Sequence, residues 1–192
     1  MSTKSFVFTG SGGQGVITAA IVLGEAAALH EGLNAVQTQV YGPEARGGAT
    51  RSDLIVSTDP IRYPKVINPH VLVCLTQESY NKFAPIIRPG GLLIADSSFV
   101  STVRKADARQ VVLPMYETVK KEIGKTVVFN ICMLGCVLSF TGIVGKESVV
   151  KAISSRMSEA HLDMNLRALD LGMKLAQSAA SGIVHPHPQT VS

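Results

Sequence analysis

A glycine loop between a short apolar strand and a long apolar helix is the sequence feature that most constrains this fold. The loop is Gly10-Ser11-Gly12-Gly13-Gln14-Gly15, and it follows a predicted strand at residues 5–9. The helix predicted from residue 16 to about residue 30 is apolar on nearly all sides, which is typical of a helix packed between two layers. A strand, a glycine turn and a buried helix together predict the first unit of an α/β fold.

Strands and helices continue to alternate along the chain. Further strands are predicted at residues 35–40, 52–57, 71–75, 92–95 and 111–113, and further helices at residues 78–87, 117–123, 128–141, 146–156 and 162–176. Helical stretches between strands favour right-handed crossovers and a mainly parallel sheet. We therefore predict an α/β protein with a single Rossmann-like domain over residues 1–180, a mainly parallel sheet flanked by helices, a helical C-terminal part and an extended tail at residues 181–192.

The second predicted strand differs from a central strand of a parallel sheet. Its residues alternate, with Val36, Thr38 and Val40 on one face and Gln37 and Gln39 on the other. A strand inside a parallel sheet is normally apolar on both faces because helices cover both. We therefore expect this strand to have one polar or interfacial face.

Composition argues against several classes of protein. The formal net charge is +4 without a basic block, whereas nucleic-acid-binding proteins cluster their Lys and Arg residues. Cys74, Cys132 and Cys136 are too few for a disulfide framework or an iron–sulfur cluster, so we expect buried thiols that behave as small apolar groups. Polar residues interrupt the apolar stretch 127–144, which predicts a buried helix and no membrane span. Because the N-terminus also lacks a signal-peptide core, we expect a soluble, cytoplasmic protein.

The glycine loop has two interpretations. Gly10, Gly12 and Gly15 match the dinucleotide-binding pattern G-x-G-x-x-G, in which a helix N-terminus favours an anion. That pattern needs an acidic residue at the end of the second strand to bind a ribose, and Tyr41 and Gly42 stand there instead. In the structural alternative, the glycines let the helix and strand approach closely, and Gln14 hydrogen-bonds a neighbouring loop or chain.

A second glycine-rich loop, Tyr41-Gly42-Pro43-Glu44-Ala45-Arg46-Gly47-Gly48, follows the second strand. The planar guanidinium of Arg46 could bind a carboxylate or a phosphate through two parallel hydrogen bonds. In the alternative interpretation, Glu44 and Arg46 pair with each other or with an adjacent subunit and hold the shape of the loop.

The sequence offers no catalytic constellation. Glu44, Asp96, His30 and His70 are each isolated from other acid–base groups in the sequence. We expect these four residues to serve as turn, interface or surface residues, and we predict no catalytic residue and no metal ligand in this chain.

The two loops together resemble a known family. Residues 10–15, residues 41–48 and the following Ser52-Asp-Leu-Ile-Val-Ser57 are similar to the gamma subunit of 2-oxoacid:ferredoxin (acceptor) oxidoreductases. Ile61-x-Tyr63-Pro64-x-Val66, Asn130 and Asn165 also match that family pattern, so the resemblance covers residues 4–180. The YGPEARGG form of the second loop is most similar to the 2-oxoglutarate branch, and the pyruvate and branched-chain branches remain alternatives.

The resemblance implies an oxidative decarboxylation in which a 2-oxoacid, coenzyme A and an oxidised acceptor give acyl-CoA, carbon dioxide and reduced acceptor. The implied cofactors of the complex are thiamine diphosphate, magnesium and iron–sulfur clusters, held by alpha, beta and delta subunits, and this chain alone binds none of them. The implied acceptor is ferredoxin or another carrier that reacts with the complex. The candidate coenzyme A or anion contacts, or interface braces, are Gly10, Gly12, Gly13, Gln14, Gly15, Tyr41, Gly42, Pro43, Glu44, Arg46, Gly47 and Gly48. Among these, Arg46 is the first choice as an anion ligand, and Gln14 is the second as a hydrogen-bonding brace.

Two other functions stay open, and an oligomer is expected. One is a free-standing Rossmann-type nucleotide-dependent oxidoreductase, and the other is an assembly module that contacts no ligand. The apolar first helix and the stripe of Leu162, Leu166, Leu169, Met173 and Ala176 offer apolar surface to a partner, so we predict a homodimer of the isolated chain.

Overall fold

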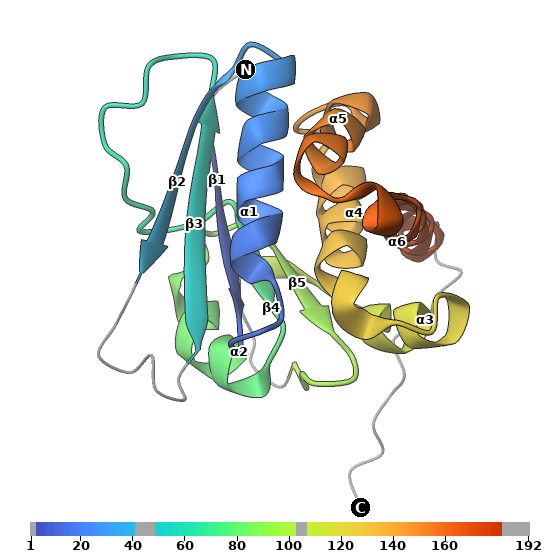
Figure 1. Ribbon diagram of the computed structural model, residues 1–192. Coiled ribbons are helices and arrows are strands. Elements are labelled where there is room, and N and C mark those ends of the chain that lie inside the picture. Colours follow the sequence, from blue (N-terminus) through green and yellow to red (C-terminus); the bar gives the residue numbers. More distant parts are fainter. Residues whose placement is uncertain (1–2, 41–48, 103–106, 182–192) are drawn as a thin grey trace, which may run out of the picture.

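The computed structural model describes residues 3–40, 49–102 and 107–181, which form a six-stranded sheet with helices on both faces (Figure 1). The strand order is β2-β3-β1-β4-β5-β6. The strands are β1 (Lys4–Gly10), β2 (Asn34–Val40), β3 (Thr50–Ser57), β4 (Val71–Cys74), β5 (Gly91–Asp96) and β6 (Ala108–Leu113). Each predicted strand is present, and its ends lie within three residues of the prediction.

The sheet is mixed, because one strand runs against its neighbours. The pairs β1–β4, β4–β5 and β5–β6 are parallel, whereas β3 is antiparallel to both β1 and β2. Only the nine residues 41–49 join β2 to β3, and a parallel neighbour needs a crossover of about a dozen residues or more. The prediction of a mainly parallel sheet is therefore confirmed for three of the five strand pairs, and the pairing of β3 was not predicted.

The position of β2 explains its alternating sequence. In the described part of the chain it is an edge strand that pairs with β3 alone, and the side chains of Val36, Gln37, Thr38 and Gln39 are all half-buried. The Gln37 amide donates a hydrogen bond to the Ser52 hydroxyl at 2.8 Å. This polar, partly exposed strand agrees with the expectation of an interfacial face.

Helices cover the two faces of the sheet unequally (Figure 1). On one face, α1 (Val16–Glu25) lies between the sheet and the C-terminal helices, which confirms the prediction of a helix packed on both sides. On the other face, α2 (Gln77–Phe83) packs Tyr80 and Phe83 onto Leu72 and Leu93 of the sheet. The further helical segments are the π-helical turn Ala26–His30, the 3-10 turns Ala84–Ile86 and Thr126–Val128, α3 (Met115–Glu122), α4 (Phe129–Thr141), α5 (Lys146–Arg156) and α6 (Glu159–Ala180).

The C-terminal part is helical, as predicted, and α4 and α6 cross in close contact. A Cβ atom on Gly172 of α6 would overlap the Cys132 carbonyl oxygen, and one on Gly135 of α4 would overlap the Leu169 carbonyl oxygen. The apolar stripe of α6 therefore packs within the chain, with Leu169 and Ala176 fully buried. Because α1 is buried as well, neither α1 nor the apolar stripe of α6 offers the surface on which the homodimer was predicted. The homodimer stays a prediction.

The helix predicted from the most apolar stretch is short. α4 has 13 residues, whereas a bilayer-spanning helix needs about 20. Within the described ranges, no helix is both long and apolar enough to cross a membrane. The domain boundary at residue 180 and the extended tail stay predictions, because residues 182–192 lie outside the described part of the chain.

Candidate functional site

The first glycine loop and both anchors of the second loop lie at the same end of the sheet. β1, β4, β5 and β6 run in one direction, so their carboxyl ends meet there. Gly10 at the end of β1 is the antiparallel partner of Thr50, and Arg51 is the partner of Val40. Because neighbouring strands lie about 4.8 Å apart, the second loop leaves and re-enters the sheet within roughly 10 Å of β1. The second loop itself, with the candidate residues Tyr41, Gly42, Pro43, Glu44, Arg46, Gly47 and Gly48, lies outside the described residues.

Gln14 links the residue after β1 to the residue after β4. Its side-chain oxygen accepts a hydrogen bond from the Ser11 amide at 2.7 Å, and its side-chain nitrogen donates to the Leu75 carbonyl at 3.2 Å. The chain leaves β1 toward β2 on one side and leaves β4 toward β5 on the other. Such a switch point is where open α/β sheets bind dinucleotides. Here the Gln14 side chain joins the two strand ends across it.

The fold explains some glycines of the loop and not others. Gly15 is the N-cap of α1 with φ of +71°, and a Cβ atom there would lie 2.6–2.8 Å from side-chain atoms of Asn130 on α4. Gly13 also has a positive φ, of +88°. Gly12 has neither a positive φ nor any atom within 4 Å of an added Cβ atom. Nothing in the described part of the chain therefore requires glycine at position 12.

A cavity of about 280 Å³ lies beside the glycine loop. Its lining residues are Gly13, Gln14, Tyr116, Thr126, Val127 and Phe129. The rings of Tyr116 and Phe129 meet edge to face with centroids 5.7 Å apart, and the Phe99 ring lies 4.9 Å from the first and 6.4 Å from the second. Val127 is 74% exposed at the rim. We call the glycine loop, residues 10–15, together with this cavity the carboxyl-end site.

The lining of the cavity favours binding over proton transfer. None of the described lining side chains carries a charge, and the polar groups that they offer are the hydroxyls of Tyr116 and Thr126 and the amide of Gln14. Concave sites lined by aromatic and apolar groups with a few polar contacts are typical of ligand binding. Sequence reasoning missed Tyr116, Thr126, Val127 and Phe129. They lie about a hundred residues from the loop, and no local pattern marked them.

Asp96 has a structural role beside this cavity. It ends β5 fully buried, and its carboxylate accepts hydrogen bonds from the backbone amides of Ser98 and Tyr116, both at 2.8 Å. Burial raises the pKa of this carboxyl, and the two amide hydrogen bonds oppose that effect. Asp96 thus ties the end of β5 to the first turn of α3 and positions Tyr116 in the cavity wall.

The two histidines considered as candidates lie apart from the carboxyl-end site. His70 lies near the start of β1, where its ring hydrogen-bonds the Ser5 hydroxyl at 2.8 Å. Burial, and then the nearby Arg88, lower the pKa of His70. His30 is exposed at the end of the π-helical turn. The structure therefore places neither histidine with the glycine loop, and Glu44 lies outside the described residues.

The described residues do not fit a metal ion or an iron–sulfur cluster. Across residues 3–40, 49–102 and 107–181, no three His, Cys, Asp or Glu side chains gather to hold a metal. Cys74, Cys132 and Cys136 are free and buried, as predicted. Burial raises the pKa of the Cys74 thiol to about 12 and that of the Cys136 thiol well above its ordinary value, so neither is a ready thiolate ligand.

Comparison with known proteins places the chain among 2-oxoacid oxidoreductase subunits. The family model for pyruvate ferredoxin/flavodoxin oxidoreductase matches residues 5–175. A 2-oxoglutarate synthase subunit, KorC, from Methanocaldococcus jannaschii is 43% identical over 91% of this chain and 94% of its own length. The ketoisovalerate oxidoreductase subunit VorA from Methanothermobacter marburgensis is 33% identical over 90% of this chain, which corresponds to 36% of that protein.

A solved structure has the same fold. The gamma subunit of a keto/oxoacid ferredoxin oxidoreductase from Geobacter sulfurreducens superimposes with a TM-score of 0.84 and is 36% identical. The match covers 91% of this chain and 99% of that subunit. The similarity therefore extends over nearly the whole of both chains.

Proposed function

Because this chain belongs to the pyruvate ferredoxin/flavodoxin oxidoreductase family, we propose that it is the gamma-type subunit of a multi-subunit 2-oxoacid:ferredoxin oxidoreductase that uses 2-oxoglutarate. The observation that carries this proposal is the 43% identity to a 2-oxoglutarate synthase subunit over nearly the full length of both chains. The complex converts 2-oxoglutarate and coenzyme A to succinyl-CoA and carbon dioxide, and two electrons pass one at a time to the acceptor. The family resemblance seen in the two glycine loops is confirmed.

In this proposal the chain contacts coenzyme A and supports the neighbouring subunits, and it performs no proton transfer. The described side chains that line the cavity of the carboxyl-end site carry no charge, which supports a binding role, and we assign the reacting groups to other subunits. Those subunits hold thiamine diphosphate, magnesium and the iron–sulfur clusters, and the chemistry of decarboxylation and electron transfer belongs to these cofactors. The alpha, beta and delta subunits are the proposed partners, and the complex is located in the cytoplasm.

We assign the contact with coenzyme A to the carboxyl-end site and the second loop that starts beside it. Arg46 is the proposed anion ligand, because guanidinium groups recognise phosphates through paired hydrogen bonds. Gln14 is the proposed brace, since its side chain already joins residue 11 to residue 75 across the strand ends. Open space beside Gly12 supports the close approach of a ligand or a partner at this point.

Anaerobic isolation of the chain with its native partners tests the proposed complex. We expect recovery of thiamine-dependent subunits, and coenzyme-A-dependent dye reduction with 2-oxoglutarate. Activity with pyruvate or a branched-chain 2-oxoacid would support the proposed complex but assign it to the pyruvate or branched-chain branch of the family. A chain recovered without partners, with bound NAD or flavin, would replace the proposal by the free-standing nucleotide-dependent oxidoreductase.

Two substitutions test the role of the loops separately from assembly. Arg46→Ala should raise the Michaelis constant for coenzyme A. Arg46→Lys, which keeps the positive charge, should raise it less. Gly12→Ala should leave the free energy of unfolding unchanged within about 0.5 kcal/mol, because no atom of the described residues lies within 4 Å of the added methyl group. The same variant should lower activity in the complex. Normal assembly and an unchanged Michaelis constant for both variants would instead identify a pure assembly module.

A further inference from the structure

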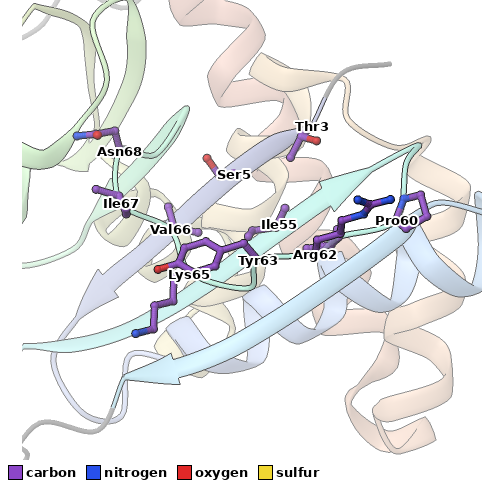
Figure 2. A pocket seen from close by; sticks show the side chains of 11 residues that line it. Thr3, Ser5, Ile55, Pro60, Arg62, Tyr63, Lys65, Val66, Ile67 and Asn68 are labelled. Atoms are coloured by element: carbon purple, nitrogen blue, oxygen red, sulfur yellow. The ribbon is translucent and has the colours of Figure 1, made fainter.

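A second groove, on the face of the sheet that carries α2, is separate from the carboxyl-end site. It has a volume of about 370 Å³ and lies between β1, β3 and the connecting segment, residues 58–70 (Figure 2). Its inner wall includes Ile55 and Val66, which are 5% and 7% exposed. We call it the β1–β3 groove.

The connecting segment is held firmly at both ends. The Ser57 hydroxyl accepts a hydrogen bond from the Asp59 amide at 3.1 Å. The Arg51 guanidinium donates to the Val66 carbonyl at 2.7 Å, and the Asn68 side chain donates to the Ile86 carbonyl at 3.0 Å. These anchors hold both ends of the mostly exposed residues 60–65, which lowers the entropy lost when a partner binds.

Apolar and basic side chains face outward from this segment. Tyr63 and Ile67 line the groove and are 60% and 67% exposed. Figure 2 shows the Tyr63 ring between the charged ends of Arg62 and Lys65. Neither Arg62 nor Lys65 makes an ion pair or a hydrogen bond with another described residue. Exposed tyrosine and arginine beside an apolar wall are typical of the energetic centres of protein interfaces.

We propose that the β1–β3 groove docks an acidic segment of another subunit of the same complex. Carboxylates of that segment pair with Arg62 and Lys65, and an apolar side chain enters between Tyr63, Ile67 and Ile55. This inference rests on the proposed function, because it requires a multi-subunit complex. Because Arg62 and Lys65 have no ion-pair partner among the described residues, they favour a negatively charged partner. The exposed apolar surface favours a permanent subunit contact over a transient encounter.

Other occupants fit the groove less well. The C-terminal residues 182–192 contain no Asp or Glu, and α6, which precedes them, packs on the opposite face of the sheet. A second copy of the chain in a two-fold contact centred on this groove would bring two copies of Arg62 and Lys65 together. An acidic electron carrier would match the charges, and it would differ from a subunit in changing the Michaelis constant for ferredoxin while leaving assembly normal.

The test compares two charge-reversal pairs in the reconstituted complex. The groove pair is Arg62→Glu with Lys65→Glu, and the control pair is Lys151→Glu with Lys174→Glu, on exposed positions of α5 and α6. Each chain is titrated into complex depleted of it, and coenzyme-A-dependent dye reduction gives the apparent dissociation constant. The groove pair should raise this constant at least about tenfold, because it places like charges in contact, and the control pair should leave it unchanged.

Photo-cross-linking of the assembled complex provides a readout that does not depend on the charge variants. A benzoylphenylalanine at position 67 in the otherwise unchanged chain should cross-link to a segment of another subunit that contains Asp or Glu. Equal dissociation constants for both pairs, or no cross-link from position 67, would overturn the proposal. Normal assembly of the groove pair with a raised Michaelis constant for ferredoxin would assign the groove to the electron carrier and would also overturn it. Failure of the unchanged chain to join any complex would refute the proposed function itself.

Discussion

The contact between Gly15 and Asn130 predicts a large loss of stability on adding one methyl group at the glycine loop. Gly15→Ala places a non-glycine residue at φ of +71°, in the left-handed region, which costs about 1–2 kcal/mol. Its Cβ atom would also lie 2.6–2.8 Å from Asn130, so side chain and helix must shift, at a cost of about 1–3 kcal/mol. The free energy of unfolding should therefore fall by about 2–5 kcal/mol, a large part of ordinary domain stability.

A double-mutant cycle separates the two causes of this loss. Asn130→Gly removes the side-chain atoms that the new methyl group would meet, but it leaves φ at position 15 unchanged. In that background, Gly15→Ala should cost only the backbone part, about 1–2 kcal/mol, so the coupling energy should be about 1–3 kcal/mol.

Urea denaturation followed by circular dichroism measures these differences if the slope m stays constant. For a chain of this size each kcal/mol lowers Tm by about 2–4 °C, which gives an independent check by thermal unfolding. A cost below about 0.5 kcal/mol for Gly15→Ala would refute the argument, because that is the range of a neutral surface substitution. A cost that is the same with and without Asn130 would refute the packing part alone.

Three further predictions concern packing and titration. Gly172→Ala should lower the free energy of unfolding by about 3 kcal/mol or more, because its Cβ atom would overlap the backbone of α4; a denaturation midpoint equal to that of the unchanged chain would contradict this. Cys74, with its pKa raised to about 12 by burial, should react with iodoacetamide at pH 8 only after unfolding, and rapid labelling of the native chain would show an accessible thiolate. Hydrogen bonds from Ser148 and Gly145 lower the pKa of Glu31, so its ionised form stabilises the fold above the ordinary glutamate pKa, and this contribution is lost as pH falls through the lowered pKa. The stability difference between the unchanged chain and Glu31→Gln should therefore shrink on acidification, and a constant difference from pH 7 to 3 would refute this prediction.

Local sequence determined the individual elements of this protein well. The alternation of residues 35–40 predicted a polar or interfacial face, and β2 is an edge strand, because among the described strands only β3 pairs with it. The apolar first helix predicted a helix covered on both sides, and the glycine loop before it predicted a turn between strand and helix. These features depend on residues close together in the chain, so hydrophobic periodicity and turn residues are sufficient to predict them.

Only the tertiary structure shows the order of the strands and which residues line the cavity. β3 inserts between β2 and β1, and this depends on which strands pair over long stretches of chain. Asn130 reaches Gly15 across 115 positions, and Tyr116 and Phe129 meet the glycine loop only because α3 and α4 fold back over the carboxyl end of β1. The two loop motifs by themselves identified the family, whereas the carboxyl-end site exists only once distant segments pack together, because no single segment can bury its own apolar face.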